Sequence, residues 1–343
     1  MLNEQTTQIS APKKAAKTEF DVIGFFAKFA PLIFLIVLII AFGLANERFL
    51  SPRNISNILT EVSIFGLMSI GMTFVILTAG IDLSVGSTLA LAGMMAAFVA
   101  TGGNYEGAAT DSATTWWGFA FLTAIGVGIA AGLLQGFTTN WFGVPPFVVT
   151  LGGMTIFRGI TLLVGGGGPI SGFDAGFRWW GRGDIFGVPV PVCLFGFFAV
   201  VAWVTLKHTK FGRNVFAVGA NPEAARLSGI NVKFVITAVY TITGFFAGLA
   251  AFVLAARLNS AEAVAGMSFE LRVIASVVIG GTSLFGGIGG VAGTVVGALL
   301  IGVMMNGLVM LNVQSFWQQI VIGVIIVLAV AFDTYAKSRR SSA

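Results

Sequence analysis

The chain has 343 residues, of which 56% are hydrophobic and only 10% are charged, and its net charge is +5 at pH 7. Because a soluble domain carries roughly 25% charged residues, this chain cannot cover a water-facing surface, and a bilayer is the solvent that suits it. The positive charge favours lysines and arginines held on the cytoplasmic side of a membrane. It does not indicate a nucleic-acid partner, because no basic patch is interleaved with stacking aromatic residues.

Apolar runs long enough to cross the hydrocarbon follow one another along the chain. Residues 1–28 are largely polar and predict a mostly disordered cytoplasmic tail. A single all-α, polytopic transmembrane domain is expected over 29–335, with 336–343 as a C-terminal tail. We expect about ten transmembrane helices (8–10). Their approximate ranges are 29–45, 62–79, 84–101, 117–138, 147–164, 189–206, 234–254, 271–285, 290–311 and 316–332.

The segment 271–285 is short and ends in glycine-rich sequence, so we expect a short or broken helix there. Residues 75–97 (VILTAGIDLSVGSTLALAGMMAA) weakly echo 277–301 (VVIGGTSLFGGIGGVAGTVVGALLI). Each has an apolar run, a break at small residues and then a helix rich in small residues. Transporters are often built from such internal repeats.

Basic residues gather in three regions of the chain. Twelve of the 19 lie before the first span, within 207–233 or at the C-terminus. All three regions fall on one side if six spans precede 207–233 and four follow it. The excess of positive charge predicts that this side is the cytoplasm, with both termini there. The loop 101–115 has no basic residue and suits the outside.

The sequence lacks the residue sets of common enzymes. The only histidine, His208, lies beside Lys207 and Lys210, and the only cysteine, Cys193, lies in an apolar run. A zinc site or a hydrolytic triad therefore lacks its ligands or its base. The GxxxxGK[ST] loop for ATP is also absent, so no cofactor is expected on this chain and a partner must supply any ATP hydrolysis.

Charged residues within membrane spans mark function because they are expensive to place there. Five candidates lie near expected helix ends or breaks: Glu61, Asp82, Arg158, Glu270 and Arg272. Asp82 and the nearby Ser84 suit the cap of the following helix. Asp82, Ser84, Glu270 and Arg272 are structural or gating candidates. No mid-helix chain of Asp, Glu and His is present, which counts against a proton-coupled pump.

Residues 219–229 (GANPEAARLSG) interrupt the apolar runs with a short helix, expected over 222–228. Asn221 suits its N-cap, Pro222 its first position and Gly229 the left-handed position after its end. A helix this short is not stable alone in water, so it must dock against something. It either packs under the chain's own helices or enters a groove on a cytoplasmic partner.

Glu223-Ala224-Ala225 followed by Gly229 resembles the EAA-xxx-G motif of ABC importer permeases, although the I-x-L-P part of that motif is missing. Residues 72–87 (MTFVILTAGIDLSVGS), 216–232 (FAVGANPEAARLSGINV) and 277–303 (VVIGGTSLFGGIGGVAGTVVGALLIGV) resemble the permeases of the ribose/xylose/galactose importer family. The resemblance covers about residues 30–335. It implies a coupling helix that docks on an ATPase subunit, formed by Asn221, Pro222, Glu223, Ala224, Ala225, Arg226, Leu227, Ser228 and Gly229.

The resemblance further implies a homodimeric pore in the bacterial inner membrane, a periplasmic sugar-binding protein and an ATPase that carries ATP and Mg²⁺. The expected function is uptake of a monosaccharide or related polyol by alternating access. The alternative is a self-sufficient, ion-coupled secondary sugar transporter. Candidate pathway residues are Thr73, Thr78, Thr150, Arg158 and Asn306. Many relatives have Glu-Leu-Asp where this chain has Glu270-Leu271-Arg272, which makes a substrate assignment by analogy unsafe.

Overall fold

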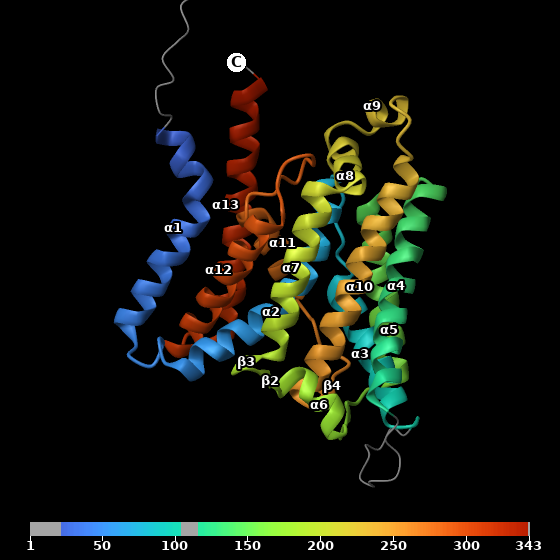
Figure 1. The fold of residues 1–343 in the computed structure, drawn as a ribbon, viewed down its shortest axis with the longest axis vertical. Coiled ribbons are helices and arrows are strands. Elements are labelled where there is room, and N and C mark those ends of the chain that lie inside the picture. The colour runs from blue at the N-terminus through green and yellow to red at the C-terminus, as the bar shows by residue number, and fades with distance from the viewer. Residues whose placement is uncertain (1–21, 104–115, 342–343) are drawn as a thin grey trace, which may run out of the picture.

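The computed structural model describes residues 22–103 and 116–341, which form a bundle of long helices (Figure 1). The tail before residue 22 and residues 104–115 of the expected outer loop lie outside the described residues. Within the described part, six helices are apolar and long enough to cross a membrane. These are α2 (Pro52–Leu77), α4 (Trp117–Trp141), α5 (Pro146–Val164), α7 (Val190–His208), α10 (Val232–Leu258) and α12 (Val291–Met310).

Further helices complete the bundle and its ends. They are α1 (Val22–Ala45), α3 (Val85–Ala100), α6 (Ala175–Arg182), α8 (Lys210–Ala220), α9 (Pro222–Leu227), α11 (Phe269–Ile279) and α13 (Ser315–Ser341). The helical, polytopic architecture is confirmed, while the count of ten spans stays a prediction. Helix α1 begins inside the range expected for the N-terminal tail, and α13 continues beyond residue 335. The short segment expected near 271–285 corresponds to the 11-residue helix α11.

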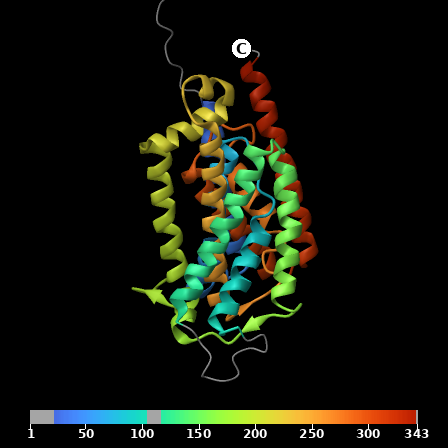
Figure 2. The ribbon, with the colours of Figure 1, turned by 90° about the vertical axis from the view of Figure 1, so that its right-hand side faces the viewer.

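Two helices form the centre of the bundle. The apolar window of α2 is 89% buried and that of α10 is 72% buried, against 22% for α5 and 28% for α7. Helix α10 packs against α4, α2 and α3, and α2 also packs against α12, α11 and α7. Figure 2 shows α7 and α13 on opposite flanks of the bundle. An apolar helix with this much exposed surface is suited to contact lipid or another protein.

Glycines set the close packing of α4 on α10. A Cβ at Gly128 would meet the carbonyl oxygen of Gly244, and one at Gly132 would meet that of Tyr240. Gly136 and Gly248 continue the same contact along the two helices. Small residues at a spacing of four let helix backbones approach in this way.

Helices α2 and α11 end in the same backbone geometry. After α2, the amides of Ala79 and Gly80 donate to the carbonyls of Ile76 and Val75 at 2.9 and 3.0 Å. After α11, the amides of Gly281 and Thr282 donate to the carbonyls of Val278 and Val277 at 2.9 and 3.1 Å. Both ends are Schellman motifs with a residue at positive φ. This agreement lies within the two segments that the sequence suggests as repeats.

The start of α2 differs from the sequence-based boundary. The helix begins at Pro52, ten residues before the expected span at 62, and Ser51 caps it by accepting the amide of Asn54 at 3.4 Å. Because the first turns of α2 contain polar residues, hydropathy alone does not predict them as part of a membrane span.

Two short strand pairs lie at the end of the bundle away from α9. β1 (Ile170–Ser171) pairs with β4 (Ser260–Ala261), and β2 (Asp184–Ile185) pairs with β3 (Val188–Pro189), both antiparallel.

Candidate functional site: the exposed helix α9 and its connection to the bundle

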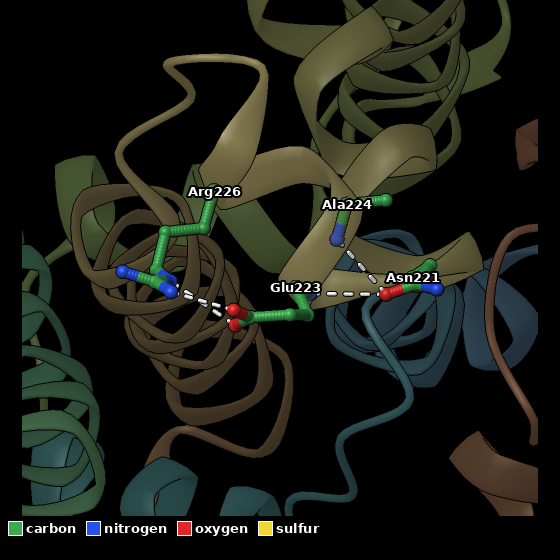
Figure 3. Close-up of polar contacts among 4 residues, drawn as sticks. All are labelled: Asn221, Glu223, Ala224 and Arg226. Atoms are coloured by element: carbon green, nitrogen blue, oxygen red, sulfur yellow. Dashed lines mark hydrogen bonds and ion pairs between the residues drawn. The ribbon is translucent and has the colours of Figure 1, made fainter.

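Helix α9 begins with a complete N-terminal cap. The side-chain oxygen of Asn221 accepts hydrogen bonds from the amides of Glu223 and Ala224, each at 3.0 Å (Figure 3). Pro222 occupies the first helical position, where its missing N–H leaves no donor unsatisfied. The predicted N-cap is therefore present.

The C-terminal end of α9 is equally well defined. The amide of Gly229 donates to the carbonyl of Arg226 and the amide of Ile230 to that of Ala225, both at 3.0 Å. Gly229 has φ +82°, the left-handed conformation that ends a helix in a Schellman motif. The helix ends at Leu227, one residue before the expected end, and Ser228 is its C-cap. Six residues are thus held in a helix by caps at both ends.

One side chain anchors α9 to the rest of the chain. Ala225 is buried, whereas Glu223, Ala224, Arg226 and Leu227 are exposed. Leu227 is 77% exposed although it is a large apolar residue. The sequence left open whether α9 packs under the chain's own helices or enters a groove on a partner. Within this chain, only Ala225 of α9 is buried. The opposite face remains available for another protein.

An ion pair crosses the exposed face of α9. The Arg226 guanidinium donates from Nη2 to Glu223 Oε1 at 2.5 Å and from Nε to Oε2 at 3.0 Å (Figure 3). These hydrogen bonds, and then the opposite charge, lower the pKa of the Glu223 carboxyl and raise that of Arg226 from their ordinary values. Both side chains are 65% exposed, so the pair contributes a fixed, charged contact surface more than stability.

Helix α8 connects α9 to the bundle through backbone contacts. A Cβ at Gly219 would collide with the carbonyl oxygen of Leu77 at the end of α2. The same carbonyl accepts the amide of Gly287 at 2.9 Å, and Gly286 lies against the carbonyl of Gly219. The end of α8 therefore touches both helix breaks, the one after α2 and the one after α11. This contact was not predicted from the sequence, although each break contains glycine.

Three of the five predicted pathway residues are buried. Thr73 and Thr150 are buried, and their hydroxyls contact Thr294 Oγ1 at 2.7 Å and the Ile81 carbonyl at 3.3 Å. Thr78 is also buried and donates to the carbonyl of Val75.

Two further predicted pathway residues fix contacts between segments. Arg158 Nη1 donates to the carbonyls of Ala263 and Ala265 at 2.7 and 2.8 Å, so it ties α5 to the segment before α11. Asn306 exchanges hydrogen bonds with Asn54 at 2.9 and 3.1 Å. Each of the five residues has a defined packing partner, and a role for them in the pathway stays a prediction.

The residues named as structural or gating candidates form two groups. Asp82 Oδ1 accepts two hydrogen bonds from Ser84, one from its backbone amide at 2.8 Å and one from its hydroxyl at 2.7 Å. The side-chain amide of Gln135 in α4 donates to the hydroxyl oxygen of Ser84. Ser84 stands at the N-cap of α3, but its side chain makes no capping bond to that helix. Asp82 thus holds the chain entering α3.

Glu270 and Arg272 lie in the first turns of α11. Glu270 is half-buried, and its carboxylate lies close to Gly86 at the start of α3. Arg272 Nη1 lies 3.7 Å from Glu61 Oε1 of α2. The charge at 272 that departs from the family pattern therefore has a partner of opposite charge.

Comparisons with known proteins agree with this architecture. Residues 54–330 match the family described as "Branched-chain amino acid transport system / permease component". The chain is 41% identical to the ribose import permease of Bacillus subtilis strain 168 and 40% identical to the D-allose transport system permease of Escherichia coli K12. Each match covers 96% of this chain and 98% of the relative.

A third relative is the galactose/methyl galactoside import permease of Escherichia coli K12, which is 36% identical over 90% of this chain and 94% of its own. No solved structure matches the chain significantly. The helical fold and these relatives define a multi-pass inner-membrane permease, a transport subunit that is not itself an enzyme. More narrowly, the chain belongs to the permease family of the ribose/xylose/galactose-type monosaccharide ABC importers.

Proposed function

We propose that this permease moves a monosaccharide (a pentose or hexose) or a related polyol across the inner membrane by alternating access. A separate ATPase subunit that carries ATP and Mg²⁺ drives it, and a periplasmic binding protein delivers the sugar. Membership in an ABC importer family implies both partners. The observation that carries the proposal is the capped helix α9, which is held by Ala225 and leaves Leu227, Glu223 and Arg226 on its outer face.

The family description names branched-chain amino acids, whereas the relatives reported above are named for sugars. The relatives match almost the whole chain, so a sugar is the better-supported substrate class. An uptake panel that contains ribose, allose, xylose, galactose and leucine discriminates between the two classes.

We place the α9 end in the cytoplasm, together with the first residue of α1 and the last of α13, which lie at the same end (Figure 1). Lys207, Lys210, Arg213, Arg226 and Lys233 all fall in the segment at this end. The ammonium of Lys207 lies 5.0 Å from the Trp203 ring centre and that of Lys233 lies 4.9 Å from that of Trp141. Tryptophans mark a membrane interface on either side, and the excess of lysine and arginine favours the cytoplasmic one.

The transmission path follows from the contacts of α8. When the ATPase subunits close on ATP, they displace α9, and α8 passes the movement to the carbonyl of Leu77 and to Gly286 and Gly287. These residues belong to the breaks after α2 and α11. Movement there reorients the paired segments of a homodimer and opens the pathway to one side at a time.

Substitution of Leu227 tests this proposal. We expect Leu227→Asp to weaken retention of the ATPase roughly tenfold, because an apolar contact at the centre of a docking face is worth about 1–2 kcal/mol. Glu223→Arg should also release the ATPase by reversing the charge. The measurement is co-purification in mild detergent, with the ATPase identified by mass spectrometry and assayed.

Phe186→Asp is the matched control, because Phe186 is fully exposed at the opposite end of the bundle. This variant should retain the ATPase. If Leu227→Asp retains it equally well, α9 does not couple the two subunits. Sugar uptake by liposomes that hold this chain alone would support the ion-coupled alternative.

A further inference from the structure

A polar cavity of about 610 Å³ opens at the end of the bundle away from α9. Its wall combines the start of α2 with the end of α6, the β2–β3 turn and the end of α10. The side chains that line it include two arginines and an aspartate, and the Nε of Arg182 donates to the carbonyl of Arg257 at 2.7 Å. The polar side chains of the lining are Ser56, Asn57, Thr60, Arg182, Asp184 and Arg257.

A charged pair lies one helical turn beyond this cavity. Asn57 at the cavity and Glu61 are four residues apart on α2, so they share one face of that helix. Glu61 faces Arg272 of α11 at 3.7 Å, and the exposed fractions of the two side chains are 46% and 24%. The pair therefore remains reachable from outside the protomer.

Exposed charge in this position does not suit a lipid-facing surface. Helix α2 is apolar and long enough to cross a membrane, and ionisable side chains in such helices face water-filled cavities or protein. The exposed surfaces of α5 and α7 carry large apolar residues instead, such as Ile156 and Val200, each about 60% exposed. Unlike those surfaces of α5 and α7, the side of α2 that bears Asn57 and Glu61 exposes polar and charged side chains.

The pair also has hydrogen-bonding capacity to spare. Its 3.7 Å separation is too long for a direct hydrogen bond, so Glu61 Oε1 and Arg272 Nη1 can both still pair with a ligand. Arg272 Nε is buried without a partner among the residues that the structure describes, and it does not meet a ligand from outside. The guanidinium lies 5.4 Å from the Phe269 ring centre, which fixes its position without using a donor. The two terminal nitrogens of a guanidinium supply four donors and a carboxylate accepts at two oxygens, so adjacent hydroxyls of one neutral ligand match both groups.

We propose that Glu61, Arg272 and Asn57 form a binding site for a neutral polyhydroxylated ligand, reached through the outer cavity. This inference rests on the proposed function and places the sugar's first contact with the permease on the α2–α11 side of the bundle. The site is distinct from Thr73, Thr78 and Thr150, which are buried.

Thiol labelling in the intact importer tests the position of the site. Replacing Cys193, the single cysteine, with serine gives a background for Asn57→Cys and for the control Val200→Cys on the apolar face of α7. We expect a charged methanethiosulfonate reagent to label position 57 at least roughly tenfold faster than position 200, because only a thiolate in water reacts. Saturating sugar, tried as ribose, allose, xylose and galactose, should slow labelling at 57 only.

Glu61→Gln tests the chemistry with the size of the side chain preserved. We expect the sugar concentration for half-maximal uptake to rise roughly tenfold, because a hydrogen bond to a charged group is lost, while ATPase retention is unchanged. Equal labelling at 57 and 200, or labelling at 57 that no transported sugar slows, overturns the site. Cross-linking between two copies through position 57 also overturns it, since the face would then be a dimer contact. Loss of the import role itself would instead appear in the wild-type importer as absence of uptake of all four sugars.

Discussion

At the scale of single residues, the termini of α9 decide whether a six-residue helix exists at all. A helix leaves four amides and four carbonyls unpaired at its ends, which in α9 is most of its backbone groups. Asn221 binds two of those amides, and Gly229 allows the two closing hydrogen bonds at the other end. These two residues therefore define the shape that a partner would meet.

A substitution at Gly229 tests whether the backbone conformation at the end of α9 matters for coupling. Valine at φ +82° is strained, so Gly229→Val should destabilise the end of α9 by about 1–2 kcal/mol and reduce ATPase-coupled uptake while membrane insertion stays normal. No described residue lies within 4 Å of a Cβ built at Gly229, so crowding is not the expected cause. Uptake assays and membrane-fraction blots measure both properties.

Gly229→Asn is the control, because asparagine adopts the left-handed conformation more readily than valine. It should retain most of the uptake. Normal uptake by Gly229→Val would contradict a role for the shape of α9 in coupling.

At the scale of elements, α8 is the rigid connection between α9 and the bundle. Thr209 caps it by accepting the amide of Gly212 at 3.1 Å, and Val215 and Val218 are buried. Phe211 stacks on Phe74 of α2 with ring centres 6.3 Å apart. Because α8 meets α2 through both its side chains and its backbone, we expect a displacement of α8 to reach α2.

The backbone contact at Gly219 gives a direct test of this connection. Gly219→Ala places a methyl group against the carbonyl of Leu77, where backbone on both sides leaves little room to adjust. We expect a loss of about 1–3 kcal/mol in stability, seen as a lower Tm, and uptake reduced more than ATPase retention.

Gly196→Ala in α7 is the matched control, because its added Cβ has no neighbour within 4 Å in the described part of the chain. It should leave Tm and uptake close to wild type. Unchanged uptake in Gly219→Ala would show that coupling does not pass through the contact of α8 with α2.

At the scale of the whole molecule, the bundle has two chemically different ends. The α9 end gathers lysines and the exposed helix, whereas the opposite end carries the short strand pairs and the polar cavity with its two arginines. Between them, α2 and α10 are buried and α4, α5 and α7 present apolar surface. This division suits a protein with one partner on each side of a membrane.

Cysteine labelling tests the orientation of the ends. In a Cys193→Ser background, Phe186→Cys in the β2–β3 turn should react with an impermeant reagent in intact spheroplasts, because its side chain is fully exposed at the end we place in the periplasm. Ser228→Cys, at the α9 end, should react only after permeabilisation. The reverse pattern would invert the proposed topology. Ala109, which the sequence also suggests as an outer position, lies outside the described residues.

Much of this protein could be predicted from local sequence. Hydropathy predicts the helical, polytopic class because an apolar run of sufficient length has one stable form in lipid. The positions of Asn221, Pro222 and Gly229 predict α9 within one residue, because caps act through neighbouring backbone groups. The family follows from long matches in the same order, and the relatives confirm it.

Tertiary structure alone decided which side chains meet. Sequence identified Glu61 and Arg272 as intramembrane charges but did not pair them, since they lie on helices far apart in the chain. It also named Thr73 and Thr150 as pathway candidates because they are polar, which stays a prediction. Only the structure shows what their hydroxyls contact, namely Thr294 and the carbonyl of Ile81. Hydropathy missed the first ten residues of α2 because many of them are polar. The structure shows that these polar side chains have distant partners, such as Asn306 for Asn54. Local sequence determines which helices form, because their hydrogen bonds are internal. Which face of a helix is buried or reachable depends on its neighbours, and only the assembled bundle supplies them.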